Sequence, residues 1–397
     1  MARRPVWLTR NVLAVGVVSL LTDASSEMIL PFLPLFVASL PGGGALFVGV
    51  IEGVADTVSA LLKLVSGRWA DKLGRNRPFM LGGYGLSALA RPFIALAVFP
   101  WHVLAVRSVD RVGKGLRSSP RDALLALSVP PENHGAAFGF HRAMDHAGAV
   151  IGPLLALALL TWFTSDLRVI FALAAIPGLL AIAAILFGVS EAAPVASAKS
   201  GSRFLMPNRG LLSVLIPVSV FALANASDTF LLLRAGAAND LRLLPLLWVG
   251  LHVVRSLSST PGGMLADKIG RRLTLGIGWL VYVGVMAGLA LAESQVAIYA
   301  LFLSYGLFTG LSESPQKALV ANFAPKTAEG TSFGWYNLTL GLLALPANLL
   351  FGAIWQEVSI SAAFLFSAAT GALAVLALVL CSPIAGKPAE PVSNPIR

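Results

Sequence analysis

Carboxylates recur at helical spacing inside the long apolar runs of the sequence. Asp23 and Glu27 lie four residues apart in the first run, and Glu52 and Asp56 repeat that spacing in the second. A helix places residues four apart on one face. Desolvation favours the neutral form of such a carboxyl group, whereas a neighbouring arginine favours its charged form. A change of surroundings would therefore bind or release a proton, and we interpret Asp23, Glu27 and Asp56 as candidates for proton coupling.

A stripe of basic residues follows in the apolar run at 102 to 125. Its members, three or four residues apart, are Arg107, Arg111, Lys114, Arg117 and Arg121, with Asp110 beside them. Two interpretations of these charges stay open. They either form a static ion-pair network that joins neighbouring helices, or they leave cations free to attract the carboxylate or phosphate group of a solute.

The elements that hold these charges are too apolar for a soluble protein. Apolar residues make up 56% of the chain and charged residues 12%, which is more apolar surface than one soluble core can bury. A spanning helix needs roughly 20 apolar residues, so a chain of this length accommodates about twelve spans. The single cysteine, Cys381, excludes an internal disulfide framework and a site built from several thiolates.

The net charge of +10 does not indicate a nucleic-acid partner, because the cations flank apolar runs and form no soluble basic domain. The basic segments lie at 1–10, 68–77, 199–209, 268–272 and 387–397, whereas the connection at 41–47 carries no charge. Cytoplasmic loops of membrane proteins are enriched in lysine and arginine. This pattern predicts that both termini and the loops after the even-numbered helices face the cytoplasm.

Apolar runs bounded by glycine, proline or charged residues predict two sets of six helices. The first set lies near 11–38, 46–69, 78–99, 102–125, 137–162 and 167–189. The second set lies near 210–234, 243–265, 273–292, 296–320, 332–355 and 359–382. We therefore expect one six-helix bundle over 1–189 and another over 210–382, joined by a flexible linker at 190–209 and followed by a cytoplasmic tail at 383–397.

The two halves also share sequence. The block at 67–75 reads GRWADKLGR, and 196 positions later the block at 263–271 reads GMLADKIGR. A second block, at 115–126, is matched 195 positions later at 310–321. Within that second match Asp122 corresponds to Lys317, so the sign of the charge is reversed. Duplication of a six-helix unit explains both matches.

The repeated G-x-x-A-D-K-x-G-R block, placed in a basic loop after the second helix and again after the eighth, resembles the signature loop of the major facilitator superfamily. Arg107-x-x-Asp110 in the fourth helix is similar to the second motif of that family. Gly148-x-x-x-Gly152-Pro153 resembles the bending motif of its bacterial drug and proton antiporters. The resemblance implies an all-α membrane protein whose two pseudo-symmetric six-helix bundles rock around a central cavity lined mainly by helices 1, 4, 7 and 10.

The resemblance also implies roles for particular residues. Helices 1 and 4 border the cavity in this family, so Arg111 or Lys114 is the expected counter-charge of the proton-coupling carboxylates. The expected substrate contacts are Lys114, Arg117, Asn225, Asp228, Arg255 and Glu313. The expected cytoplasmic gate comprises Asp71, Arg75, Asp122, Asp267 and Arg271. Asp71 is expected to pair with Arg75 and with a position where helices 4 and 11 meet, and the reversed sign at Lys317 predicts a second gate organised differently.

No phosphate-binding loop, H-E-x-x-H motif or G-x-S-x-G elbow is present, so we expect no enzyme, no metal and no cofactor. The favoured hypothesis is a monomeric, proton-coupled exporter of a small organic molecule across the bacterial inner membrane. Its partners would be the substrate, protons and the lipid bilayer, with no nucleic acid. One alternative is a proton-coupled importer of an anionic solute, such as an organic acid, a siderophore-like compound or a phosphorylated compound. The other is a membrane receptor or assembly platform that transports nothing.

Overall fold

The computed structural model describes residues 5–42, 45–191, 206–225, 228–236, 243–325 and 328–381. Some helical side chains lie outside the described residues as well, among them those of Glu52 and Asp56, so the surroundings of these two predicted carboxylates are not described. The tail at 383–397 and most of the predicted linker also lie outside. Within the described ranges the chain is helical and contains no β-strand.

The first half of the chain folds into six membrane-crossing segments. They are α1 (Arg10–Glu27) with α2 (Leu33–Ser39), α3 (Ala45–Leu73), α4 (Arg77–Ala90) with the 3-10 helix η1 (Arg91–Leu96), α5 (Pro100–Leu127), α6 (His134–Trp162), and α7 (Leu167–Leu173) with α8 (Ala175–Gly188). A short 3-10 turn, η2 (Pro131–Asn133), joins α5 to α6.

The second half repeats this count. Its segments are α9 (Arg209–Ala224) with α10 (Asp228–Gly236), α11 (Leu243–Ile269), α12 (Arg271–Leu291), α13 (Gln295–Phe323), α14 (Glu329–Glu357) and α15 (Ile360–Leu380). Each predicted helix overlaps one of these segments, which confirms the predicted twelve-helix architecture. By length and apolarity alone, 7 helices of the described chain are able to cross a membrane. The charges of α1 and α5 and the short length of α9 keep these three out of that count.

Two crossing segments are interrupted at corresponding places in the two halves. Pro31 follows α1, and proline lacks the N–H group that a continuing helix needs. α9 ends at Ala224, and Asn225 leaves the helical conformation with φ −87° and ψ 79°. The Ala224 carbonyl accepts hydrogen bonds from Tyr282 Oη at 2.6 Å and Ser367 Oγ at 2.5 Å. These bonds satisfy backbone that would otherwise be unpaired in an apolar medium.

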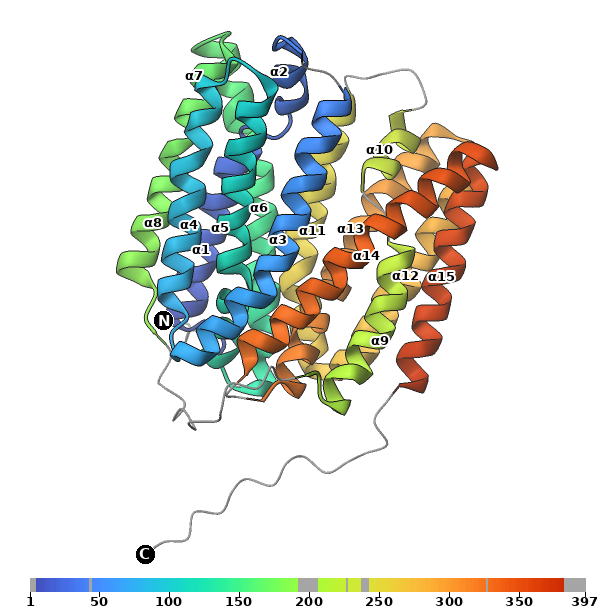
Figure 1. Cartoon of the computed structure of the whole chain (residues 1–397). Coiled ribbons are helices and arrows are strands. Elements are labelled where there is room, and N and C mark those ends of the chain that lie inside the picture. Colours follow the sequence, from blue (N-terminus) through green and yellow to red (C-terminus); the bar gives the residue numbers. More distant parts are fainter. Residues whose placement is uncertain are drawn as a thin grey trace, which may run out of the picture.

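The two halves lie side by side, with the first half in blue to green and the second in yellow-green to red in Figure 1. Two helices of the second half pack on the first: α11 on α6, and α14 on α3. α1 begins, α8 ends, α9 begins and α15 ends at one end of the bundle, the lower end in Figure 1, which we call the linker side.

Glycines bring the two halves into backbone contact on the linker side. A Cβ atom at Gly67 of α3 would overlap the carbonyl oxygen of Gly330 in α14, and one at Gly263 of α11 would overlap that of Gly135 in α6. The two crossings are related by the internal repeat, because Gly67 aligns with Gly263 and Gly135 with Gly330. Neither crossing has room for a side chain, so the helices approach as closely as their backbones allow.

Candidate functional site

The aspartate of the first repeated loop contacts the opposite half. Asp71 lies near the end of α3, and its carboxylate accepts hydrogen bonds from the N–H groups of Gly330 and Thr331 at 2.9 and 2.6 Å. The Thr331 hydroxyl donates a third bond, at 2.5 Å. The first N–H groups of a helix have no partner within it and carry partial positive charge. Asp71 therefore caps α14 only while the two halves are in contact.

The aspartate of the second loop makes the matching contact. Asp267, near the end of α11, accepts hydrogen bonds from the N–H groups of Gly135 and Ala136 at the start of α6, at 3.0 and 2.8 Å. Arg271 lies 3.5 Å from the Asp267 carboxylate and also donates to the carbonyl of Pro131. The sequence predicts a second gate that differs from the first, yet both aspartates cap a helix of the other half.

Arg75, the predicted partner of Asp71, does not join this contact. Its side chain is exposed and forms no hydrogen bond or ion pair in the described part of the chain. Gly74, just before it, ends α3 with φ 62°, and Gly270 ends α11 with φ 101°. Residues that carry a side chain rarely adopt this left-handed backbone conformation. The second glycine of each repeated block, Gly74 or Gly270, therefore turns the chain after the aspartate.

A buried ion pair joins α5 to α13 near the linker side. Lys317 Nζ lies 2.6 Å from one oxygen of Asp122, and Arg121 Nη2 lies 2.9 Å from the other. Asp122 and Lys317 are 0% and 2% exposed. Because they occupy equivalent positions of the repeat, equal signs would set like charges against each other, and the reversed sign gives attraction instead. We call this pair, together with the caps made by Asp71 and Asp267, the linker-side gate, because the sequence predicts a gate at Asp71, Asp122 and Asp267.

The predicted carboxylates of α1 lie against the glycines of α6. Cβ atoms at Gly148 and Gly152 would lie 3.0 and 2.8 Å from the Cβ atoms of Asp23 and Glu27, respectively. The glycine spacing of α6 thus provides space for two carboxylates one turn apart. Both side chains are half-buried, and neither carboxylate accepts a hydrogen bond among the described residues. Both are therefore placed to exchange a proton without first breaking a hydrogen bond.

The basic stripe of α5 is divided between different neighbours. Arg117 donates to Ser87 Oγ at 2.5 Å, and its guanidinium carbon lies 4.4 Å from the centre of the Tyr84 ring. This predicted substrate contact therefore faces α4. Arg91 of η1 is 3.0 Å from Asp110, within a buried pair. Arg91 and Asp110 thus have the arrangement of the static ion-pair interpretation, whereas Arg117 is held by a hydroxyl group and an aromatic ring.

Lys114 is the cation of the stripe with the strongest relation to the α1 carboxylates. It is half-buried, its side chain forms no hydrogen bond among the described residues, and its electrostatic neighbours include Asp23. Lys114 is also one of the main electrostatic neighbours of Glu27. Arg111 is not among the main electrostatic neighbours of either carboxylate. Of the two predicted counter-charges, Lys114 is thus the one whose electrostatic neighbours include both carboxylates.

An ion-pair network between the two halves includes Glu313, one of the predicted substrate contacts. Arg142 of α6 lies 2.6 Å from Glu313 of α13 and 3.0 Å from Asp145. Ser19 of α1 also donates a hydrogen bond to Asp145. Arg142 and Asp145 are three residues apart, a spacing that places them together on a helix. Their position at the boundary between the halves depends on tertiary packing, which the spacing does not reveal.

Three predicted substrate contacts of the second half gather at the break between α9 and α10. Arg255 of α11 is 2.7 Å from Asp228, and its guanidinium carbon lies 5.3 Å from the centre of the Tyr305 ring. The Tyr305 hydroxyl donates to Asn225 Oδ1 at 3.0 Å. The interrupted helix thus presents charged and amide groups in one place. Discontinuous membrane helices commonly form the binding sites of transporters.

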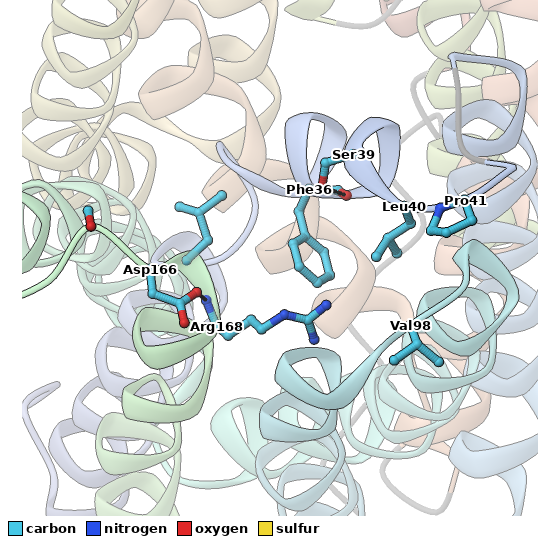
Figure 2. Close-up of a pocket in the computed structure, with 9 residues that line it drawn as sticks. Phe36, Ser39, Leu40, Pro41, Val98, Asp166 and Arg168 are labelled. Atoms are coloured by element: carbon cyan, nitrogen blue, oxygen red, sulfur yellow. Dashed lines mark hydrogen bonds between the residues drawn. The ribbon is translucent and has the colours of Figure 1, made fainter.

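A separate pocket of about 400 Å³ lies at the end opposite the linker side. Figure 2 shows Arg168 beneath Phe36, its guanidinium carbon 5.0 Å from the ring centre. Arg168 also donates to the Ala95 carbonyl at 2.5 Å. The residues lining the pocket are Phe36, Ser39, Leu40, Pro41, Val98, Ser165, Asp166, Leu167 and Arg168. None of them is a predicted site residue, so this pocket is distinct from the charged groups between the halves.

Two related six-helix halves, closed against each other at one end and holding paired charges between them, define a multi-pass membrane transporter. Comparison with known proteins identifies its family. The chain belongs to the major facilitator superfamily, whose sequence profile matches residues 15–254 and 249–395.

Individual relatives agree with this assignment. The chain is 32% identical to an uncharacterised MFS-type transporter of Methanocaldococcus jannaschii, over 94% of this chain and 95% of that protein. It is 26% identical to the multi-drug resistance efflux pump PmrA of Streptococcus pneumoniae, over 79% of this chain and 82% of the pump. The solved structure of the proton:xylose symporter XylE superposes with a TM-score of 0.75 at 16% identity, covering 92% of this chain and 94% of the symporter.

Proposed function

We propose that this transporter exports a small organic molecule from a bacterial cytoplasm in exchange for protons, by alternating access between its two halves. The observation that carries the proposal is the pair of α1 carboxylates, Asp23 and Glu27, held against the glycines of α6 with no hydrogen bond among the described residues. Carboxylates in that setting bind a proton when desolvated and lose it when a cation comes near.

Lys114 supplies the cation. Lys114 lies on α5 and Asp23 lies on α1. A rearrangement of helices within the first half would therefore change how strongly the amine stabilises the charged form of the carboxylate. Protonation of Asp23 would weaken its attraction to Lys114, and approach of the amine would release the proton. A conformational change that moves these helices would therefore be coupled to proton uptake on one side and release on the other.

The linker-side gate supports alternating access. Asp71 and Asp267 each depend on contact with the other half, and so does the buried pair of Asp122 with Lys317. Opening the linker side would break all three contacts together. We propose that the linker side faces the cytoplasm, because the basic segments around Arg68 and Lys268 lie there. The described conformation would then be closed toward the cytoplasm.

An organic molecule of amphipathic or cationic character is the substrate class we favour. Asp23 and Glu27 offer negative charge, whereas Arg117 is held by Ser87 and Tyr84 on α4. A relative that is 26% identical to this chain bears the name multi-drug resistance efflux pump. Import of an anionic solute would need cations available between the halves. Arg117 is held by Ser87 and Tyr84, and Arg255 is paired with Asp228, so these two cations offer less support for an importer.

Proton movement in proteoliposomes with an enclosed pH-sensitive dye tests this proposal, with amphipathic cations and organic anions screened in parallel. We expect proton flux driven by an amphipathic cation in the unmodified protein. In Asp23→Asn and Glu27→Gln this flux should fall about tenfold or more, since an amide cannot carry the proton. Glu293→Gln is the matched control, because Glu293 is exposed in the connection between α12 and α13.

Equal substrate movement in the control and in both α1 variants, without proton flux, would overturn the coupling role of α1. Proton flux driven by organic anions alone would instead favour the anion importer. In both outcomes the observed movement of substrate or protons itself shows that the protein is folded and inserted.

A further inference from the structure

Two histidines face each other across the boundary between the halves. The Nδ1 atoms of His146 on α6 and His252 on α11 are 3.3 Å apart. The ring centres are 5.4 Å apart, with the planes inclined by 48°. Both residues are buried, with 8% and 7% of their surface exposed. α6 and α11 also have the most extensive packing between the halves in the described chain, so any separation of the halves at this point separates the two rings.

The contact fixes the protonation pattern of the rings. A neutral imidazole has one nitrogen that donates and one that accepts. A hydrogen bond between two Nδ1 atoms therefore requires opposite tautomers, one ring with its proton on Nδ1 and the other with its proton on Nε2. Neither Nε2 atom has a hydrogen-bond partner among the described residues. The pair is thus held together by one shared proton, and each ring has an unused nitrogen.

Adding protons to this pair has two distinct effects. A first proton enters at the Nε2 atom of the donating ring and leaves the shared hydrogen bond in place, now strengthened by charge. A second proton can enter only at the accepting Nδ1 atom. It would set two N–H groups and two positive rings against each other at the observed spacing. The closed arrangement of α6 and α11 therefore accommodates one added proton and resists a second.

The surrounding charges are paired with each other. On α6, Arg142 lies one turn before His146 and Asp145 directly before it, and on α11 Arg255 is one turn from His252. Arg255 is bound to Asp228 of α10, and Arg142 to both Asp145 and Glu313 of α13. Trp248 packs edge-on against His252, with ring centres 4.9 Å apart. Because these ions already have partners, the histidine pair is the part of this cluster whose charge changes with least disturbance of other bonds.

We propose that His146 and His252 form a shared-proton site that holds at most one added proton while α6 and α11 are in contact, and that binds a second when these helices part. The site lies in the boundary between the halves, apart from the carboxylates of α1. It adds to the proposed function a second proton-binding group, which responds to the position of the halves and does not contact the substrate.

The tautomers provide a test that needs no mutation and no substrate. Nitrogen NMR of protein with 15N-labelled histidine, in lipid and at alkaline pH, distinguishes a protonated Nδ1 from a protonated Nε2. We expect one histidine protonated on Nδ1 and its partner on Nε2, with His146→Gln and His252→Gln identifying the two signals. If both rings carry their protons on Nε2, no shared bond exists and the inference fails.

The coupling to movement is tested by distances between spin labels. The labels are placed at Trp162→Cys, at the end of α6, and Val296→Cys, at the start of α13, both exposed positions, after Cys381→Ser removes the native thiol. Lowering the pH from about 8 to about 5, across the ordinary pKa of histidine, should raise the population with changed separation at least about threefold.

Four histidine variants show whether the pair causes that change in distance. His146→Gln and His252→Gln should each remove the pH response, and the double variant should match either single one, because the two rings act as a unit. His102→Gln, in a histidine at the start of α5 whose ring accepts hydrogen bonds from the N–H groups of Val98 and Phe99, should keep the response. A pH response that survives in both single variants would overturn the inference. Loss of flux in Asp23→Asn is read separately, so failure of the transport proposal and failure of this site are distinguishable.

Discussion

Single charges at the linker-side gate differ in how many partners they have. Asp122 is bound by two cations, Arg121 at 2.9 Å and Lys317 at 2.6 Å, whereas the ion pair of Lys317 is with Asp122. Removing one member of a buried ion pair leaves its partner as an uncompensated charge in a medium of low polarity. The two members of this pair should therefore differ in importance, although the repeat makes their positions equivalent.

Asp122→Asn should be more damaging than Lys317→Met. The asparagine leaves both Arg121 and Lys317 uncompensated, at a cost of about 3–5 kcal/mol, which is typical of a broken buried pair. Lys317→Met leaves Asp122 paired with Arg121, so its cost should be smaller. The double variant should be more stable than Asp122→Asn alone, since one uncompensated cation is removed.

Thermal unfolding in detergent measures these effects, and labelling of a cysteine on the linker side reports opening. Equal losses in Asp122→Asn and Lys317→Met would show that Arg121 does not support Asp122. A double variant less stable than both single variants would contradict the coupling between the two residues.

At the scale of helices, the closed linker side depends on glycines as much as on charges. α3 crosses α14 at Gly67 and Gly330, and α11 crosses α6 at Gly263 and Gly135. The caps made by Asp71 and Asp267 lie one turn beyond Gly67 and Gly263 in the sequence. The close crossing therefore positions each carboxylate at the first N–H groups of the partner helix, and the cap and the crossing act as one unit.

Gly67→Ala should open the linker side. An added methyl group would overlap the Gly330 carbonyl oxygen, and overpacking of this kind costs about 1–3 kcal/mol. Since only the closed conformation contains this crossing, the added cost shifts the population toward the open one. Labelling of a cysteine between α3 and α14 should become faster, and Gly263→Ala should act alike at the other crossing.

Gly85→Ala is the matched control for both changes. Gly85 lies within α4, and a Cβ atom there would meet nothing within 4 Å. Alanine in a helix is favoured over glycine by about 0.5–1 kcal/mol, so this variant should be as stable as the unmodified protein or slightly more stable. Unchanged labelling in Gly67→Ala, together with unchanged stability, would contradict the role assigned to the crossing.

At the scale of the whole molecule, the sequence predicts the elements well and their relations incompletely. The twelve helices follow from apolar length, and the two halves follow from the repeated block that contains Asp71 and Asp267. Contacts between the halves depend on how two bundles face each other, which no local spacing encodes. For this reason the reversed sign at Asp122 and Lys317 was visible in the sequence, whereas the ion pair between them was not.

The site shows the same limit. The spacing of Asp23 and Glu27 placed them on one face of a helix, and the glycines at 148 and 152 were visible as a separate motif. Only the fold brings the two motifs together. The basic stripe was equally visible, but helical periodicity does not specify which neighbour each residue meets, so the contact of Arg117 with Tyr84 could not be predicted.

The glycine crossings also affect the thermodynamics of closing. A seal made of long side chains would lose rotamer freedom each time the gate closed, at up to about 1.5–2 kcal/mol for each lysine, glutamate or methionine immobilised. Gly67, Gly135, Gly263 and Gly330 have no rotamers to lose. In the proposed transport cycle, sealing by backbone contact would therefore carry little entropic penalty at the crossings themselves. In that cycle the balance between closed and open forms would depend on the hydrogen bonds and ion pairs between the halves, which a proton or a solute is able to shift.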